Sequence, residues 1–143
     1  MKNAFLLVLF VAFGTALGAQ TEKTLVKAFN LDGHQSIVLD LDGEVDVQRW
    51  NNDIVRVQMH IQVDNFSAAI LKSLIAAGRY NLDGTSGDHF VISAENRKKS
   101  VVIRGNPLQD RVTYTVYVPE NVSVDVSAAT VQVGAADSNF KKK

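Results

Sequence analysis

Alternation of apolar and polar residues between Ile37 and Val63 constrains the fold of this chain more than any other feature. A period of two places successive side chains on opposite faces of an extended strand. The longest run predicts one buried face, with Arg56, Gln58 and Gln62 on the polar face. The apolar positions of that run are Val55, Val57, Met59, Ile61 and Val63.

The two shorter runs, residues 37–41 and 44–48, are close enough in sequence to form a hairpin. A two-residue turn would set Leu39 opposite a charged residue, whereas a three-residue loop sets Leu39 opposite Val45. A slip of one residue inverts every side chain of a strand, so the face pattern favours the longer loop. We therefore expect a hairpin closed by Leu41-Asp42-Gly43, with Gly43 in the left-handed position.

One segment, residues 66–78, breaks the strand pattern. Phe66, Ile70 and Leu74 are four residues apart, with Leu71 and Ile75 beside them, which predicts one amphipathic helix. We expect its apolar stripe to pack on the sheet, with partner binding as the alternative. Further strands are expected at residues 89–94, 101–104, 111–118, 122–126 and 131–133, and Pro119 should end the third of these runs.

These elements predict a mainly β single domain with one amphipathic helix at about residues 66–78. Its strands are expected to be antiparallel or stacked as in a short solenoid, and the sequence leaves the choice between sandwich and solenoid open. No feature of the chain sets an oligomeric state.

The N-terminal nineteen residues have the layout of a secretory signal peptide. A short positive start precedes an apolar run from Ala4 to Phe13 and the small residues "GTALGA". We expect cleavage after Gly18, with Ala19 as the less typical alternative, and assign residues 20–143 to the single domain, without a membrane-spanning segment. The protein would then be periplasmic, on the cell surface or secreted, and with no cysteine its stability comes from packing.

Charge offers no reason to expect nucleic acid as a partner. Without Lys2, the chain has 14 basic and 15 acidic residues. Basic residues gather at Arg97-Lys98-Lys99 and in the tail Lys141-Lys142-Lys143. We interpret the first cluster as a solvated loop and the second as a short basic C-terminal tail. Binding of an anionic headgroup or acidic glycan is the alternative.

No catalytic, metal or cofactor site is predicted. His34, His60 and His89 lack the spacing of a metal site. Ser86, Asp88 and His89 have the residue types of a catalytic triad, but neighbours on one loop rarely reach triad geometry.

Aromatic residues supply the one candidate binding site. Tyr114 shares the parity of the apolar positions in its strand, whereas Tyr117 has the opposite parity. Trp50 with Tyr117, next to Arg49, could form a platform for a sugar or a peptide. The favoured alternative is that Trp50 folds over the end of the sheet and plugs the core.

Three stretches, "SIVLDLDGEVDVQRW", "GRYNLDG" and "VTYTVYVPENVSVDV", together resemble a family of bacterial envelope β-strand-repeat proteins. The family is of unknown function and grouped as proposed adhesins (GIN-like adhesin head domains). The resemblance covers roughly residues 25–133, relative to which the helix is an insertion. It implies an exported protein, with strands that some relatives stack into a right-handed solenoid, and it brings no catalytic residues.

Two classes of function follow from this sequence. The first is a non-catalytic adhesin-like binding or structural module of the envelope, with an envelope protein or a glycan as partner. The second is a small exported hydrolase or lyase on a β scaffold. A pocket that joins His60 or His89 to two carboxylates would favour the second class, and a continuous polar sheet face would favour the first.

Overall fold

In a computed structural model that describes residues 20–127 and 131–132, the long alternating segments form adjacent strands of a five-stranded sheet. In sheet order, the strands are β1 (Thr21–Asn30), β4 (Ile54–Val63), β9 (Asp110–Pro119), β3 (Glu44–Trp50) and β11 (Val131–Gln132). β1, β4 and β9 are antiparallel neighbours, β3 lies parallel to β9, and β11 lies parallel to β3.

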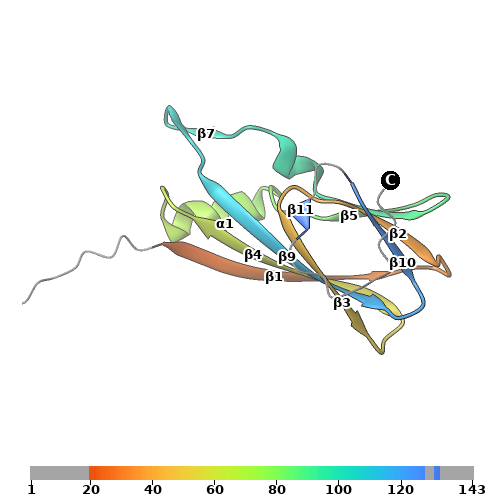
Figure 1. Cartoon of the computed structure of the whole chain (residues 1–143). Helices are drawn as coiled ribbons and strands as arrows, with labels where there is room; N and C mark the ends of the chain where they lie inside the picture. The colour runs from red at the N-terminus through yellow and green to blue at the C-terminus, as the bar shows by residue number, and fades with distance from the viewer. Residues whose placement is uncertain (1–19, 128–130, 133–143) are drawn as a thin grey trace, which may run out of the picture.

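A second sheet holds four shorter strands, seen with the first in Figure 1. Their order is β10 (Ser123–Val126), β2 (Ser36–Asp40), β6 (Phe90–Ser93) and β5 (Asp83–Ser86). β2 is parallel to both of its neighbours, and β5 is antiparallel to β6. A separate two-stranded ribbon is formed by β7 (Val102–Ile103) and β8 (Asn106–Pro107).

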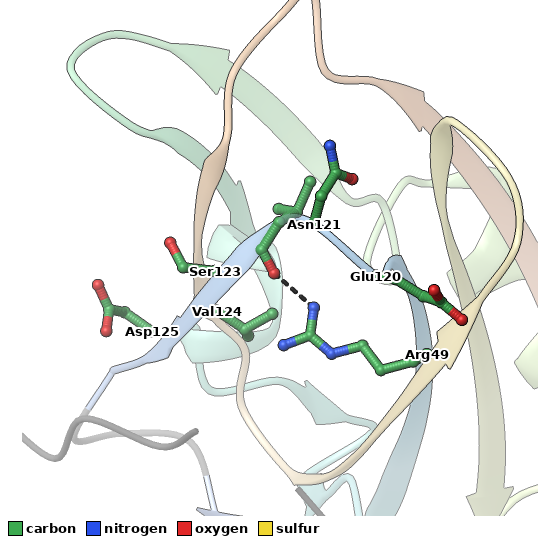
Figure 2. A pocket seen from close by; sticks show the side chains of 7 residues that line it. Arg49, Glu120, Asn121, Ser123, Val124 and Asp125 are labelled. Atoms are coloured by element: carbon green, nitrogen blue, oxygen red, sulfur yellow. Dashed lines mark hydrogen bonds between the residues drawn. The ribbon is translucent and has the colours of Figure 1, made fainter. Parts of the chain in front are cut away.

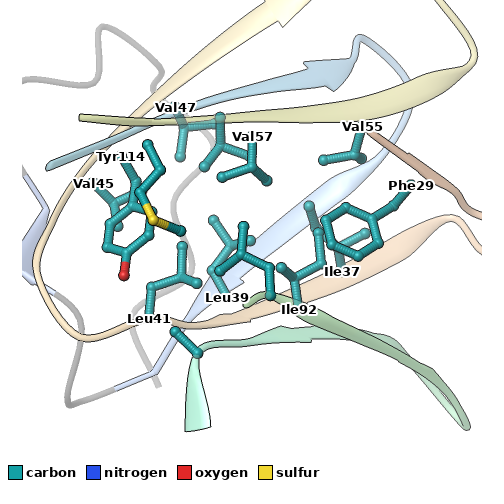
Figure 3. Packing of buried hydrophobic residues seen from close by; sticks show 14 of the residues in the cluster. Phe29, Ile37, Leu39, Leu41, Val45, Val47, Val55, Val57, Ile92 and Tyr114 are labelled. Carbon is teal, nitrogen blue, oxygen red and sulfur yellow. The ribbon is translucent and has the colours of Figure 1, made fainter. Parts of the chain in front are cut away.

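The inner faces of the two larger sheets share one hydrophobic core. Figure 3 shows the faces meeting: Val47, Val55 and Val57 come from the five-stranded sheet, and Ile37, Leu39 and Ile92 come from the other. All five apolar positions of β4 are buried, as the alternation predicts, and so is Tyr114. The expectation of a mainly β single domain with one helix is confirmed, and its two main layers are packed as a sandwich.

The predicted hairpin is wrong, because β2 and β3 belong to different sheets. The chain crosses from one layer to the other between Leu41 and Gly43. Leu39 and Val45 both still point into the core, because the inner faces of the two sheets are directed toward the space between them. Gly43 is required for a close approach: a Cβ there would lie 2.3 Å from the carbonyl oxygen of Val112.

The helix α1 covers Ala68–Ala76, slightly shorter than predicted, and buries Leu71. Gly78, with φ of 83°, follows its end in the left-handed conformation that favours glycine. A short 3-10 helix, η1 (Glu95–Lys98), follows β6. In the described ranges, no helix has the length and apolarity that crossing a membrane requires.

Other strands lie close to their predicted positions, but β1, β5 and β8 were not predicted. β1 has an irregular pattern of burial, and Leu25 and Phe29 are its main contacts with the core. β9 ends at Pro119, as predicted.

Candidate functional site

The outer face of the five-stranded sheet has a mixed polar surface that ends in an aromatic cluster. Val45 and Val47 of β3 are buried, so Asp46, Gln48 and Trp50 project to the opposite side by the strand's period of two. On β9 the same parity places Tyr117 on the outer face. Trp50 therefore reaches the polar face, at the end of its strand.

Trp50, Arg56 and Tyr117 are in contact there, and we call them the Trp50 cluster. The two ring centroids are 5.5 Å apart with an interplanar angle of 40°. The guanidinium carbon of Arg56 lies 4.9 Å from the Trp50 centroid and 4.5 Å from that of Tyr117. These distances correspond to cation–π contacts with both rings. The cluster thus combines two aromatic surfaces with one positive charge.

Trp50 is half-buried on this face, which contradicts its favoured role as a core plug. Its indole Nε1 donates a hydrogen bond of 2.9 Å to the carbonyl oxygen of Ile54. This bond holds the ring across the turn between β3 and β4. The cluster is therefore fixed before any ligand arrives, which reduces the entropy cost of binding.

Arg49, the third predicted site residue, lies on the other face of β3. Its guanidinium donates to the carbonyl oxygens of Pro119, at 3.0 Å, and Val122. Figure 2 shows Arg49 reaching the turn before β10, near Glu120. The hollow that these residues line, together with Asp125, has a volume of about 460 Å³. The structure thus brings Trp50 and Tyr117 together but separates Arg49 from them.

A smaller hollow of about 230 Å³, which we call the turn hollow, adjoins Trp50. Its lining is Trp50, Asn51, Asn52, Asp53, Pro119, Glu120 and Asn121. Amide side chains both donate and accept hydrogen bonds, and carboxylates accept them. One wall is thus an aromatic ring and the others carry amides and carboxylates, which suits a ligand with one apolar face and several hydroxyl groups.

The histidines considered in the sequence lie apart from this hollow. His60 contacts Thr24 at 3.2 Å and Glu22 at 3.7 Å on the outer face. His89 Nδ1 is 2.6 Å from the hydroxyl of Ser36. Among the residues that the structure describes, no group of three or more histidine, aspartate and glutamate side chains is arranged to hold a metal ion.

Sequence analysis missed one buried ionic cluster, the Asp110 cluster, formed by Asp110, Arg79, Arg97 and Tyr80. Arg79 donates to both carboxylate oxygens of Asp110, at 2.9 and 3.2 Å. Arg97 donates to the same carboxylate at 2.6 Å, and the Tyr80 hydroxyl at 2.8 Å. Arg97 is buried, so its interpretation as part of a solvated loop is wrong.

Burial alone would raise the pKa of Asp110. Hydrogen bonds from Arg79 and Tyr80, together with the charge and hydrogen bond of Arg97, outweigh this effect and hold the pKa below its usual value. The carboxylate has three side-chain donors, so we assign the Asp110 cluster to stability. It ties the segments after α1 and β6 to the start of β9.

Comparison with known proteins gives little beyond this geometry. No protein-family model and no curated protein matches the chain. Among solved structures, a protein from Clostridium sporogenes with a provisionally assigned role in cell adhesion is similar, with 13% sequence identity and a TM-score of 0.40. The match covers 74% of this chain and 46% of that protein. So distant a likeness carries no argument about this chain.

Proposed function

We propose that this protein is a non-catalytic, adhesin-like binding module of the bacterial envelope, and that the Trp50 cluster and the turn hollow bind a glycan. The observation that carries the proposal is the half-buried Trp50 ring beside a hollow lined with amides and carboxylates. Sugars present C–H groups on one face and hydroxyls around the edge. The ring matches the first feature, and the side chains of Asn51, Asn52 and Asp53 match the second.

A glycan array probed with the purified protein tests this function. Trp50→Ala should lower the affinity for the bound glycans at least tenfold, because aromatic anchors dominate such sites. Tyr117→Phe keeps the ring and should bind like the parent protein. Ala76→Ser, on the exposed end of α1, provides a control outside the site. Equal binding by the parent and Trp50→Ala would contradict the proposal.

Stability has to be measured beside binding. Trp50→Ala removes the ring contact with Tyr117 and the cation–π contact with Arg56, both on a half-buried face. We therefore expect the unfolding free energy to fall by about 1–2 kcal/mol. A core plug would lose about 3–5 kcal/mol. Chemical denaturation of the variant distinguishes these cases and shows whether any lost binding reflects lost folding.

A hydrolase or lyase remains the alternative class. The same array glycans, incubated with the protein, would release new reducing or unsaturated ends if the alternative is right. Under our proposal they are bound and recovered intact.

Export is part of the proposal. The protein recovered from its native cell should begin at Ala19 or Gln20, which N-terminal sequencing would determine. A chain that begins at Met1 in the cytoplasmic fraction would contradict it.

A further inference from the structure

β1 presents a long open edge. It pairs with β4 over ten residues, Thr21 to Asn30, and within the described part of the chain no strand pairs with its other side. Alternate residues of an edge strand direct their N–H and C=O groups away from the sheet. An extended chain laid along this edge would satisfy these groups.

A groove runs between the first half of this edge and α1, which lies beside β1 in Figure 1. The groove has a volume of about 520 Å³. Leu25 supplies its apolar surface from β1, and Ala68, Leu71 and Ile75 supply it from α1. Leu71 is buried, whereas Leu25 and Ile75 remain partly open, so the groove has an apolar floor that solvent can reach.

Two lysines give the groove a positive charge. Lys23 and Lys72 both line it, and neither takes part in an ion pair of the described residues. Glu22 also lines the groove, but its carboxylate is engaged on the outer face, where it accepts a hydrogen bond of 3.0 Å from Gln62 and lies 3.7 Å from His60. An occupant with acidic groups would complement these ammonium groups.

We propose that this groove binds an extended acidic peptide, which adds to the open edge of β1 as a further strand. Side chains at every second position of the peptide would enter the groove, the apolar ones against its floor and the carboxylates against Lys23 and Lys72. Addition of a strand beside a helix satisfies backbone groups and side chains together. This site lies on another part of the fold from the turn hollow and is independent of the glycan proposal.

The observations favour a foreign peptide over other occupants. A lipid chain would fill the apolar floor but leave the peptide groups of the edge without partners. If a second copy paired its β1 with this one, Lys23 and Lys27 of one strand would lie close to Lys23 and Lys27 of the other. Like charges on paired strands are unfavourable.

The test uses the full-length gene product, expressed with its own N-terminal segment. The probe is a fluorescein-labelled nine-residue peptide with threonine at every second position and valine, leucine and glutamate at the positions between, so that the apolar and acidic side chains share the face that enters the groove. Fluorescence anisotropy should show saturable binding. A peptide with lysine in place of glutamate should bind at least tenfold more weakly, and so should one with alternate backbone amides N-methylated.

Variants then locate the site. Ala68 is exposed at the start of α1, so Ala68→Trp should fill the groove and weaken binding at least tenfold without unfolding the protein. Lys72→Glu should weaken it similarly. Ala76→Trp, on the same helix outside the groove, and Lys99→Glu, away from it, are the matched controls and should bind like the parent. Trp50→Ala should also leave peptide binding unchanged.

Several outcomes would overturn the proposal. These are no binding of the glutamate peptide at millimolar concentration, equal binding of the N-methylated peptide, and equal binding by Ala68→Trp. A further contradicting outcome would come from analytical sedimentation. Concentration-dependent dimers that Ala68→Trp abolishes would assign the groove to a second copy.

Discussion

Asp110 accepts buried hydrogen bonds from the side chains of Arg79, Tyr80 and Arg97. Its side chain is 6% exposed, and those of Arg79 and Arg97 are 8% and 7% exposed. Two guanidinium groups and a hydroxyl meet one carboxylate, so removing the negative charge leaves two buried cations facing each other. Breaking a buried pair by removing one partner costs much more than the pair contributes net.

Asp110→Asn should therefore lower the unfolding free energy by about 3–5 kcal/mol. The amide keeps the size of the side chain, so the loss would report charge and hydrogen bonding, not a cavity. Urea denaturation at pH 7 measures it. The control is Asp88→Asn, an exposed position on the loop before β6, which should change stability by less than about 0.5 kcal/mol. A similar small change in Asp110→Asn would show that the cluster does not hold the fold together.

The same carboxylate predicts a dependence on pH. Its folded-state pKa lies below the usual value of 3.8. Its stabilising contribution is therefore complete above the unfolded-state pKa and disappears as the pH falls through the folded-state pKa. The parent should lose stability below about pH 4 more steeply than Asp110→Asn, in denaturation curves recorded from pH 7 to pH 2. Parallel curves would contradict this assignment.

Sequence could place some of these residues but not others. The parity of Val45 and Val47 already sends Trp50 to the outer face, so the pattern held the signal that the core-plug interpretation overlooked. Arg97 gave no such signal. It stands in a basic run, and its partner Asp110 becomes a neighbour only when the chain after β6 returns to β9.

At the scale of the element, alternation shows which side of a strand is buried but not which strand lies beside it. For that reason β4 and β9 could be predicted closely, whereas the hairpin of β2 and β3 could not. Two successive strands can bury their apolar residues in one core whether they pair in one sheet or lie in two facing sheets. The alternation of apolar and polar residues is the same in both cases. The pairing of β2 with β6 and of β3 with β9, which are distant in sequence, decides between them.

β1 illustrates the opposite difficulty. Its inward positions include Lys23 and Lys27 as well as Leu25 and Phe29, since an edge strand is only partly covered. Lys27 reaches the carbonyl oxygen of Leu82 with its ammonium group at 2.5 Å. Mixed residues on one face hide the period of two, and the strand is recognised only from its pairing with β4.

The connection between β2 and β3 can be tested at Gly43. A Cβ there would lie 2.3 Å from the Val112 carbonyl oxygen and 3.1 Å from the Tyr114 ring, and φ is +152°. Gly43→Ala should push the crossing away from β9 and cost about 1–3 kcal/mol, as overpacking generally does. Gly87→Ala, where the nearest atom is 3.8 Å away, is the control and should be nearly neutral. Thermal denaturation of both variants measures the difference, and equal melting temperatures would refute the tight crossing.

The buried face of β4 offers a second test at this scale. Val57 is fully buried, while its neighbour Gln58 lies on the outer face. Val57→Asp should unfold the domain, because an unpaired charge in the core costs several kcal/mol. Gln58→Asp introduces the same charge on the polar face and should be tolerated. Circular dichroism and melting temperature would distinguish the variants, and similar values would contradict the assignment of the two faces.

At the scale of the whole molecule, the two sheets depend on each other. Their inner faces form one core, and the chain passes between them repeatedly, at its tightest in the short crossing from Leu41 to Gly43. Neither sheet could keep its inner residues buried if the other opened. We expect the sandwich to unfold as one cooperative unit, which is usual for a domain of this size.

Hydrogen exchange provides the test of that cooperativity. Amides in β2 and β6 of one sheet should exchange with the same free energy of opening as those in β4 and β9 of the other. This value should equal the unfolding free energy obtained from Trp50 fluorescence during denaturation. The β7–β8 ribbon, which has only two short strands, should exchange at a lower free energy and serves as the internal control. If β2 and β6 opened more than about 2 kcal/mol below β4 and β9, the sheets would be separate units of stability, and the shared core would not couple them.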